Sequence, residues 1–566
     1  MPIRGLRSAT RSRKIPKINQ ARTPFLIRDQ QIARLTRERF DLAVIGGGIN
    51  GAAVARDAAM RGLGVALIDR GDFAGATSSR SSKLIHGGLR YLPQGELRLV
   101  RTALAERERL LRLTAPHLVK PLRFLFPLYR GRGPGRIELG VGLWLYDLFA
   151  RTPRAQRHRR LNRAGTLAAE PMLNPVALAG GAFYYDAGGD DARLTIENAL
   201  DAAHHGGAIA NYVELERFSR VEGRIAAAAV RDRLSGTRFE LRARLFVNAA
   251  GPWIDDLRRL DDPAAAHSVR LTKGVHLVID RERLPVREAL VLGDAKGRIV
   301  FVIPHGEVVL VGTTDTDFDG DRERVAAAPE DIGYLLGVVA QGLPAAAALT
   351  AADVVASFAG LRALAAAGDG RAPSTVSREE VMVESGAGLI SIAGGKLTTH
   401  REIAGRVVDR VASILGRGAG RSPTLDTPLP GARPVEIEDQ SGAARALVAL
   451  PADSREAMTA RYGTRAIVVA SLVQRSPELA RPLAAGCPVA AAEVIFAMRY
   501  EMAVSVADFI RRRTALSWRH PRSAGAAAAA AARLMAAELG WDAAREQSEL
   551  RACDTAAPAA AGAARS

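Results

Sequence analysis

The sequence predicts an α/β protein with a separate helical domain at its C-terminal end. Three observations lead to this class. From Phe40 to about residue 420, short apolar runs typical of strands alternate with helical stretches. After a Pro- and Gly-rich segment at residues 421–431, Ala, Leu, Arg and Glu dominate and strand-like runs stop. A chain of 566 residues is also too long for one hydrophobic core, so several domains are expected.

Five segments are expected along the chain. Residues 1–39 are basic and lack an apolar period, which predicts a flexible tail, and regular structure should begin at Phe40. Residues 40–420 form the α/β part, residues 421–431 a linker, residues 432–555 the helical domain, and residues 556–566 a disordered tail. The Arg-rich start has no apolar segment, which argues against a secretory signal. It resembles either a mitochondrial transit peptide or a disordered bacterial leader.

The composition indicates the cellular compartment of the protein and the kind of partner it binds. The two cysteines, Cys487 and Cys553, lie far apart without metal-ligand spacing, so disulfides and structural zinc are not expected and a reducing cytosol is favoured. No run reaches the ~18–20 apolar residues of a membrane-spanning helix. The formal net charge of +19 suggests an anionic partner, which is nucleic acid, anionic lipid or a phosphorylated substrate. An Arg-biased, solvated surface explains the charge equally well.

The strongest local signal is a dinucleotide-binding unit. An apolar strand at residues 42–45 runs into Gly46-x-Gly48-x-x-Gly51, a helix follows to about Arg61, and a second strand ends at Asp69. The first glycine permits the tight turn, the second lets the backbone approach a pyrophosphate, and the third allows close helix–strand packing. The helix N-terminus offers free N–H groups to the phosphates. The terminal acid can accept hydrogen bonds from ribose hydroxyls.

Since NAD and FAD share this fingerprint, the choice of cofactor depends on two later segments. Residues 245–253 form an apolar strand that ends at small residues around Gly251. Residues 389–399 form another strand that enters a glycine turn and a helix, whose N-terminus can stabilise negative charge on a reduced flavin. Either segment alone is typical of ordinary scaffolding. Together with the first motif they favour FAD, bound along its whole length.

Several blocks carry a family resemblance. The segments ATSSRSSKLIHGGLRY at residues 76–91, DDARL at 190–194, RLTKGVH at 270–276, GTTD at 312–315, AGGKLTT at 393–399 and EMAVSVADFIRRRT at 501–514 resemble the FAD-dependent glycerol-3-phosphate dehydrogenases. The likeness extends from about Phe40 to Thr514. It implies a D-amino-acid-oxidase-like fold, in which a Rossmann-like FAD-binding domain is interleaved with a substrate-binding domain and followed by an all-helical cap.

The resemblance also implies the reaction and its location. The reaction expected is oxidation of sn-glycerol 3-phosphate to dihydroxyacetone phosphate, with electrons passed to a membrane quinone. Relatives of this bacterial type are cytoplasmic, peripheral on the inner face of the inner membrane, and often dimers. Two other functions remain open. One is a glycerol-3-phosphate oxidase that uses oxygen, and the other is a flavoprotein that binds or modifies RNA. The low aromatic content of 5% provides few stacking platforms and argues against nucleic acid.

The cofactor contacts follow from the motifs and the resemblance. On their own, the hydroxyl residues at 77–82 also suit a simple polar loop. The expected FAD-binding residues are Gly46, Gly48, Gly51, Asp69, Thr77, Ser78, Ser79, Ser82, Lys83, His86, Gly87, Gly251, Gly395, Lys396, Leu397 and Thr398.

The substrate contacts follow from the phosphate group. The planar fork of arginine donates two parallel hydrogen bonds to a phosphate. Arg90 and Arg362 are therefore the expected catalytic phosphate ligands, although an arginine is ordinarily a surface ion-pair partner. Tyr91 donates a further bond, and Lys396 and Thr398 bind either the substrate or the flavin.

The chain departs from the family pattern next to Arg362. Where the family usually has Gly-Val-Arg-Pro-Leu, residues 360–364 read GLRAL. Because proline restricts the backbone, its loss leaves the loop around the arginine less fixed.

The catalytic base is expected to be His276, because an imidazole with an ordinary pKa near 6.5 accepts a hydroxyl proton at neutral pH. His86 is the competitor, although its place beside two glycines suits a cofactor contact. Arginine-assisted or water-mediated proton loss is the other alternative, and a lone histidine is usually structural.

Residues 137–150 are apolar and aromatic and have arginines on both sides. Such a segment can rest in a headgroup layer while its arginines meet anionic lipids, or it can be a buried helix. The first alternative predicts peripheral, salt-sensitive attachment to a membrane.

Overall fold

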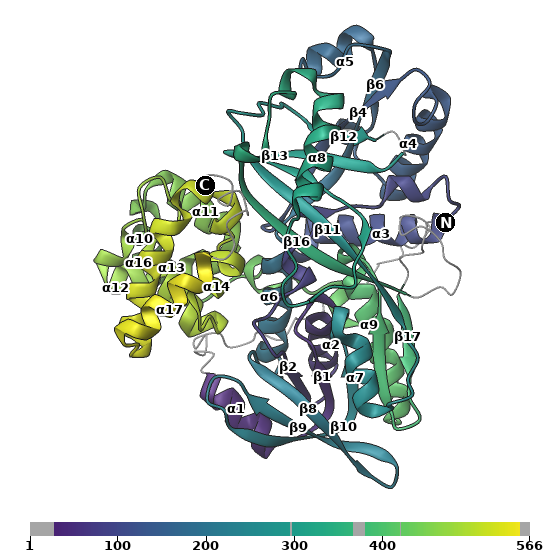
Figure 1. Ribbon diagram of the computed structural model, residues 1–566. Coiled ribbons are helices and arrows are strands. Elements are labelled where there is room, and N and C mark those ends of the chain that lie inside the picture. Colours follow the sequence, from purple (N-terminus) through teal and green to yellow (C-terminus); the bar gives the residue numbers. More distant parts are fainter. Residues whose placement is uncertain (1–27, 295–296, 366–379, 419, 555–566) are drawn as a thin grey trace, which may run out of the picture.

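A computed structural model of the chain describes residues 28–294, 297–365, 380–418 and 420–554. Its lower half in Figure 1 is built on a mostly parallel sheet with the order β17-β18-β10-β1-β2-β7. The strands are β1 (Arg39–Ile45), β2 (Val65–Ile68), β7 (Ala208–Ala210), β10 (Arg238–Asn248), β17 (Val381–Glu384) and β18 (Leu389–Ala393). Both faces of a parallel sheet are covered, so β2 and β18 are buried at every position.

Three helices cover one face of this sheet. They are α2 (Ile49–Met60), α6 (Asp191–His204) and α9 (His400–Ile414), and α2 packs against both of the others. Helix α2 follows β1 and β18 leads toward α9, as the glycine motifs predict. The small residues of α2 allow close packing against the strands, and ten of its twelve residues are buried as a result.

The other face carries α1 (Arg28–Arg37), α7 (Ile254–Asp261) and the hairpin of β8 (Val213–Val221) and β9 (Arg224–Asp232). Helix α1 corrects the expectation that residues 1–39 form a flexible tail and that regular structure begins at Phe40. Leu35 of α1 is fully buried, and Arg28 pairs with Asp232 at 2.6 Å. The remainder of that segment, residues 1–27, lies outside the described residues.

A second, larger sheet is assembled from two separated stretches of the chain, residues 84–189 and 269–365. Its path is β15-β11-β14-β13-β12-β4-β6-β3, with β16 on β11 and β5 on β6. The strands are β3 (Leu84–Ile85), β4 (Val119–Tyr129), β5 (Arg159–Asn162), β6 (Leu178–Gly189), β11 (Val269–Asp280), β12 (Ala289–Gly293), β13 (Ile299–His305), β14 (Val308–Gly312), β15 (Thr316–Asp317) and β16 (Val354–Ala365). Its helices are α3 (Leu97–Arg109), α4 (Arg136–Ala150), α5 (Arg163–Ala169) and α8 (Pro329–Gly342).

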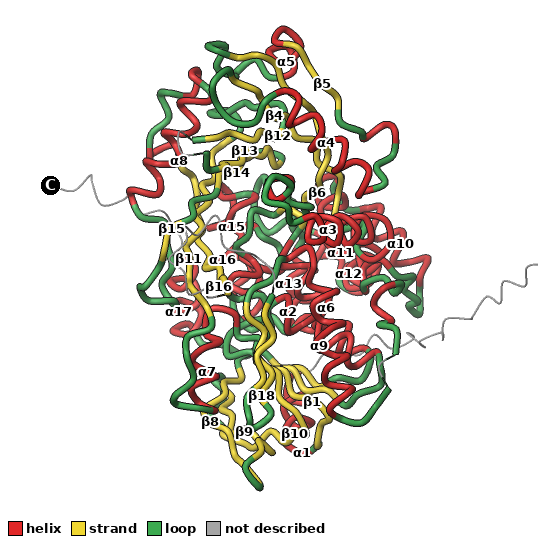
Figure 2. The backbone as a smooth tube through the Cα atoms, turned by 90° about the vertical axis from the view of Figure 1, so that its right-hand side faces the viewer, coloured by secondary structure: helices red, strands yellow, loops and turns green. Residues whose placement is uncertain are grey.

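The two sheets alternate along the chain, which confirms the interleaved α/β fold that the resemblance implies. Figure 2 shows the strands of both sheets meeting in the middle of the molecule, between the upper and lower halves.

The C-terminal part is helical, as predicted, and lies to one side of both sheets in Figure 1. Its helices are α10 (Gln440–Ala449), α11 (Ala452–Tyr462), α12 (Ala466–Arg475), α13 (Ala491–Glu501), α14 (Val506–Asp508), α15 (Leu516–Arg519), α16 (Pro521–Leu539) and α17 (Ala543–Asp554). None of the helices in the described ranges is both long and apolar enough to span a membrane. The expected tail at residues 556–566 lies outside those ranges.

The segment expected to be a linker, residues 421–431, is packed rather than free. Two short 3-10 helices, Pro423–Leu425 and Pro430–Ala432, lie within it, and Leu429 is buried. The Gly431 amide donates to Glu197 of α6 at 3.0 Å.

Candidate cofactor and substrate site

A cavity of about 690 Å³ opens at the carboxyl ends of β1, β2, β10 and β18, on the side where the two sheets meet. This is where ligands bind in open α/β sheets. Its lining runs from the first glycine turn to residues of the second sheet and of the glycine turn after β18. The predicted cofactor residues on its wall are Gly46, Gly48, Asp69, Thr77, Ser78, Ser82, His86, Gly251, Gly395, Lys396, Leu397 and Thr398.

The glycine turn between β1 and α2 has the shape that a phosphate group requires. Gly46 has φ +113°, and a Cβ there would lie 2.5 Å from the carbonyl oxygen of Ala249. A Cβ on Gly51 would collide with the carbonyl oxygen of Gly46. Gly48 is the N-cap residue of α2 and has no side chain to cap the helix. Because Gly48 lines the cavity, the N-terminus of α2 faces it. The hydroxyl of Ser78 accepts the Ile49 amide at 2.9 Å.

Asp69 lies just after β2, where a ribose is expected. Its carboxylate accepts the amides of Gly47 at 2.6 Å and Gly71 at 2.8 Å. Burial, with a smaller contribution from the charge of Asp72, raises the pKa of Asp69 to about 6. The glycine turn, the helix terminus and this acid together fit the pyrophosphate and ribose of a dinucleotide such as FAD.

The other end of the cavity gathers cationic residues. Arg362 of β16 donates to Asp315 at 2.8 Å and to the hydroxyl of Thr313 at 3.2 Å. Burial, together with the charge of nearby Arg90, lowers the pKa of Arg362. Lys396 places its ammonium 3.8 Å from the centroid of the Tyr91 ring.

Arg90 and Tyr91 lie directly behind this end. The guanidinium of Arg90 donates to the Tyr91 hydroxyl at 2.9 Å, and the described residues provide no carboxylate to pair with it. Neither residue is on the cavity wall itself, but Lys396 connects them to it. The predicted substrate residues are thus brought together, with Arg362 and Lys396 in front and Arg90 and Tyr91 behind.

His276 lies on β11 and also lines the cavity. Its Nε2 is 2.8 Å from the hydroxyl of Ser82, and its ring stacks on Phe358 at 4.9 Å between centroids. Burial and the positive charges of Arg362 and Lys83 lower its pKa well below 6.5. The expectation of an ordinary imidazole pKa is therefore wrong, and His276 is neutral throughout the physiological range.

Four predicted cofactor residues do not line the cavity. Gly51 packs on the turn, the hydroxyl of Ser79 donates to Ala76, and the amide of Gly87 donates to Tyr146. Lys83 is buried, and its ammonium pairs with Asp191 at 2.7 Å. Its ammonium is thus held by Asp191 away from the cavity wall, where a direct contact with the cofactor was expected.

Three contributions were not predicted. Arg80 lines the cavity, donates to the carbonyl of Ala359 at 3.3 Å and has a pKa that burial lowers to about 10. Asp315 holds Arg362, and the GTTD motif that contains it was the available signal. Arg512 of the C-terminal domain reaches the same cavity; it lies in the motif at residues 501–514, but nothing in that motif indicates a contact with the cofactor cavity.

Comparisons with known proteins agree with this geometry. A model described as FAD dependent oxidoreductase matches residues 41–401, and one described as the C-terminal domain of alpha-glycerophosphate oxidase matches residues 422–546. Glycerol-3-phosphate dehydrogenase 2 of Mycobacterium bovis is 40% identical over 514 residues, which are 90% of this chain and 87% of that protein. Aerobic glycerol-3-phosphate dehydrogenase of Staphylococcus haemolyticus is 35% identical over 497 residues, covering 85% and 87%.

Solved structures show the same similarity. Glycerol-3-phosphate dehydrogenase from Bacillus halodurans, complexed with FAD, superimposes with a TM-score of 0.76 at 32% identity over 93% of this chain and 96% of that one. L-alpha-glycerophosphate oxidase from Mycoplasma pneumoniae shares the fold, with a TM-score of 0.54 at 19% identity over 69% and 99% of the two chains.

Proposed function

Since the chain belongs to the family of FAD-dependent glycerol-3-phosphate dehydrogenases and oxidases, we propose that it oxidises sn-glycerol 3-phosphate to dihydroxyacetone phosphate and passes the electrons to a membrane quinone. FAD is the family's cofactor. One observation carries the proposal. A single cavity connects the dinucleotide-binding turn at Gly46 to the cationic end at Arg362 and Lys396.

The cationic end suits a small phosphate ester. A phosphate dianion would receive hydrogen bonds from Arg362 and Lys396, with Arg90 adding positive charge from behind. Because Asp315 and Thr313 hold the Arg362 guanidinium in place, little side-chain entropy is lost when the anion binds. The hydroxyl of Thr398 accepts the amide of His86 at 3.2 Å and fixes the two loops against each other.

The reaction removes two hydrogens from the substrate. FAD, when bound, would supply the acceptor for a hydride from C2. The C2 hydroxyl must also lose its proton, and His276 is the residue proposed to accept it. Its Nε2 lies 2.8 Å from the hydroxyl of Ser82, which can relay the proton in the tautomer whose hydrogen is on Nδ1.

The test is anaerobic addition of sn-glycerol 3-phosphate to the purified protein while the flavin absorbance near roughly 450 nm is followed. Rapid bleaching by this compound, and much slower bleaching by glycerol, is the expected result. A yellow protein that the substrate never bleaches would contradict the proposed reaction and leave the cofactor assignment intact.

Helix α4 supports the membrane part of the proposal. Four apolar side chains on one face are exposed: Ile137 by 80%, Val141 by 52%, Trp144 by 58% and Leu148 by 56%. Its opposite face packs into the protein through Leu143 and other residues. Exposed arginines lie on both sides of the helix, namely Arg130, Arg132, Arg136, Arg151, Arg154, Arg157, Arg159 and Arg160. An apolar stripe of this kind can enter a headgroup layer while the arginines meet anionic lipid.

Co-sedimentation with vesicles tests this surface. The protein should bind vesicles that contain anionic lipid, and the Trp144→Ser variant should bind less. The control is Val176→Ser, which changes an apolar side chain of 73% exposure outside the stripe. Equal binding by both variants and the unmodified protein would contradict the role of α4.

A second candidate acceptor is oxygen, because the C-terminal family model takes its description from an oxidase. The two acceptors are distinguished by the yield of peroxide per substrate with and without a quinone analogue. Peroxide near one per turnover that a quinone analogue leaves unchanged would favour the oxidase.

A further inference from the structure

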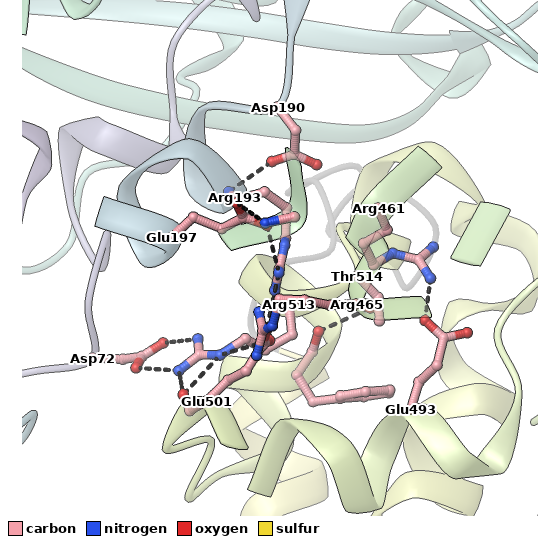
Figure 3. A network of polar contacts seen from close by, with 12 residues as sticks. Asp72, Asp190, Arg193, Glu197, Arg461, Arg465, Glu493, Glu501, Arg513 and Thr514 are labelled. Atoms are coloured by element: carbon pink, nitrogen blue, oxygen red, sulfur yellow. Dashed lines mark hydrogen bonds and ion pairs between the residues drawn. The ribbon is translucent and has the colours of Figure 1, made fainter. Parts of the chain in front are cut away.

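The loop that follows β2 is held by two arginines of the C-terminal domain. Arg513 donates to both oxygens of Asp72, at 2.7 and 2.9 Å, and Arg512 donates to one of them at 2.5 Å. Asn211 donates to the same carboxylate at 2.9 Å. Asp72 and Arg513 are fully buried in their side chains, so this contact is protected from water and salt. Figure 3 shows it at the left of the network.

Arg513 is itself fixed from behind. Its guanidinium donates to the carbonyl of Glu501 at 2.6 Å, and the Glu501 carboxylate pairs with Arg465 of the C-terminal domain and Arg193 of α6, at 2.8 and 2.5 Å (Figure 3). The network therefore joins the C-terminal domain to two elements of the FAD-binding domain. A buried ion-pair network of this kind specifies one geometry, because each member constrains the next.

The same loop forms part of the cofactor cavity. Asp69, Gly71, Asp72 and Arg512 all line it. Asp72 comes three residues after Asp69, and the amide of Gly71 between them donates to the Asp69 carboxylate. The position of the carboxylate proposed to bind the ribose is thus tied to Asp72.

A second contact from the C-terminal domain reaches the next part of the wall. The hydroxyl of Tyr212, which lines the cavity, donates to Asp508 at 2.6 Å. The side-chain Nδ2 of Asn211 also donates to the carbonyl of Met502 at 2.8 Å.

We propose that the C-terminal helical domain is a working part of the FAD site: Arg513 and Arg512, acting through Asp72, are positioning residues that hold Asp69 for the ribose of FAD. The FAD-binding domain alone would keep the contact from Gly47 to Asp69, but the loop that carries Gly71 and Asp72 would lose its anchor at Arg512 and Arg513. This inference concerns cofactor binding, so it stands or falls independently of the substrate.

The charges of Arg512 and Arg513 have a second effect on the loop after β2. Although burial opposes its ionisation, the two guanidinium groups lower the pKa of Asp72 to about 2, so Asp72 carries a negative charge at neutral pH. Arg512 and Arg513 offset the effect of this charge on neighbouring groups. The pKa of Asp69, which is about 6, is raised in part by the charge of Asp72 and so depends on how far the two arginines offset that charge. The charged residues on the loop or the cavity wall around it are Arg70, Asp72, Glu214, Arg233, Glu323 and Arg512.

Titration of the FAD-free full-length protein with FAD tests the proposal. Arg513→Met should weaken FAD binding about tenfold or more, as is usual for a coupled pair of sites. Arg511→Met is the matched control. Arg511 is in the same helical turn but donates to the carbonyls of Ala552 and Cys553, so this variant should bind FAD normally.

The pH dependence separates positioning from mere structural damage. Ionised Asp69 accepts the ribose hydroxyls, so affinity should fall as the pH drops below about 6. Arg513→Met leaves the charge of Asp72 less compensated and should move this midpoint to higher pH. Asp72→Asn removes the charge and should move it to lower pH.

Opposite shifts with weaker binding in both variants would support the proposal. Unchanged affinity, or weaker binding with one common midpoint, would overturn it. Since Arg513→Met removes a buried charge, thermal melting of each FAD-free protein checks that it is folded. The near-isosteric Asp72→Asn supplies the decisive midpoint if Arg513→Met does not fold.

Discussion

Replacing Arg362 by Met is the sharpest test of the proposed phosphate site. The substitution keeps an unbranched apolar stem and removes a guanidinium that Asp315 holds at 2.8 Å and Thr313 at 3.2 Å. A hydrogen bond to a charged group contributes about 1.5–3 kcal/mol. Loss of two such bonds to the phosphate, at the lower end of that range, gives about 3 kcal/mol, which corresponds to roughly 150-fold in kcat/KM.

The assay is anaerobic stopped-flow reduction of bound flavin over a range of substrate concentrations. The control is Arg270→Met on β11, which removes a partly exposed arginine that pairs with Asp317. An exposed pair contributes ~1 kcal/mol or less, so this variant should stay close to the unmodified enzyme. Unphosphorylated glycerol provides a second comparison, because its slow reaction does not depend on a phosphate ligand.

Two results would refute the assignment. One is a kcat/KM for Arg362→Met within about threefold of the unmodified enzyme. The other is an equal loss with glycerol and with glycerol phosphate, since that would indicate general damage to the site. FAD content must first be shown to be normal in each variant.

Three further predictions concern the base, the cofactor turn and the domain network. His276→Asn should lower kcat by about 10²–10⁴-fold, measured by single-turnover flavin reduction. Because burial keeps its pKa well below 6.5, kcat of the unmodified enzyme should show no histidine inflection between about pH 6 and 8; an inflection lost in the variant would contradict a neutral His276. Gly51→Ala should yield a protein that does not retain FAD, because its Cβ would collide with the carbonyl of Gly46, and a fully yellow variant would show that the turn adapts. Glu501→Gln should lower the free energy of unfolding by about 3–5 kcal/mol in urea titrations, because it removes the buried negative charge that Arg193 and Arg465 share. Although burial opposes ionisation, these arginines lower the pKa of Glu501 from 4.5 to about 2. The stability that Glu501 contributes is therefore complete above about pH 5 and is lost as the pH falls through about 2. Over this range the unmodified protein should lose more stability than the variant.

The parts of the fold that depend on local pattern were predictable from the sequence. The strand at residues 42–45, the glycine turn and the helix to about Arg61 appear as β1 and α2 within a few residues. These elements rest on short-range rules, because an apolar run, three glycines and a terminal acid each have a local structural consequence. The same segment indicates a dinucleotide cofactor, whereas the choice of FAD over NAD depended on the later segments at residues 245–253 and 389–399.

Residues whose role depends on a distant partner were assigned less well. Lys83 lies in a motif next to the cofactor loop, yet its ammonium is committed to Asp191, 108 residues away. Sequence supplies the charge of a side chain but not the carboxylate that neutralises it. His276 shows the same problem in another form, because its pKa depends on burial against Phe358 and on Arg362 and Lys83, and none of these is its neighbour in the chain.

The contact between the C-terminal domain and the cofactor loop was the hardest feature to predict from the sequence. Three consecutive arginines at residues 511–513 lie near the end of the last motif that carries the resemblance, and only one of them lines the cavity. Arg513 meets Asp72 across 441 residues, so no periodicity or spacing within either segment relates the two. A contact of this kind becomes visible only when both domains are in place. For that reason a domain boundary drawn on composition, at residues 421–431, separates elements that act on one cofactor loop.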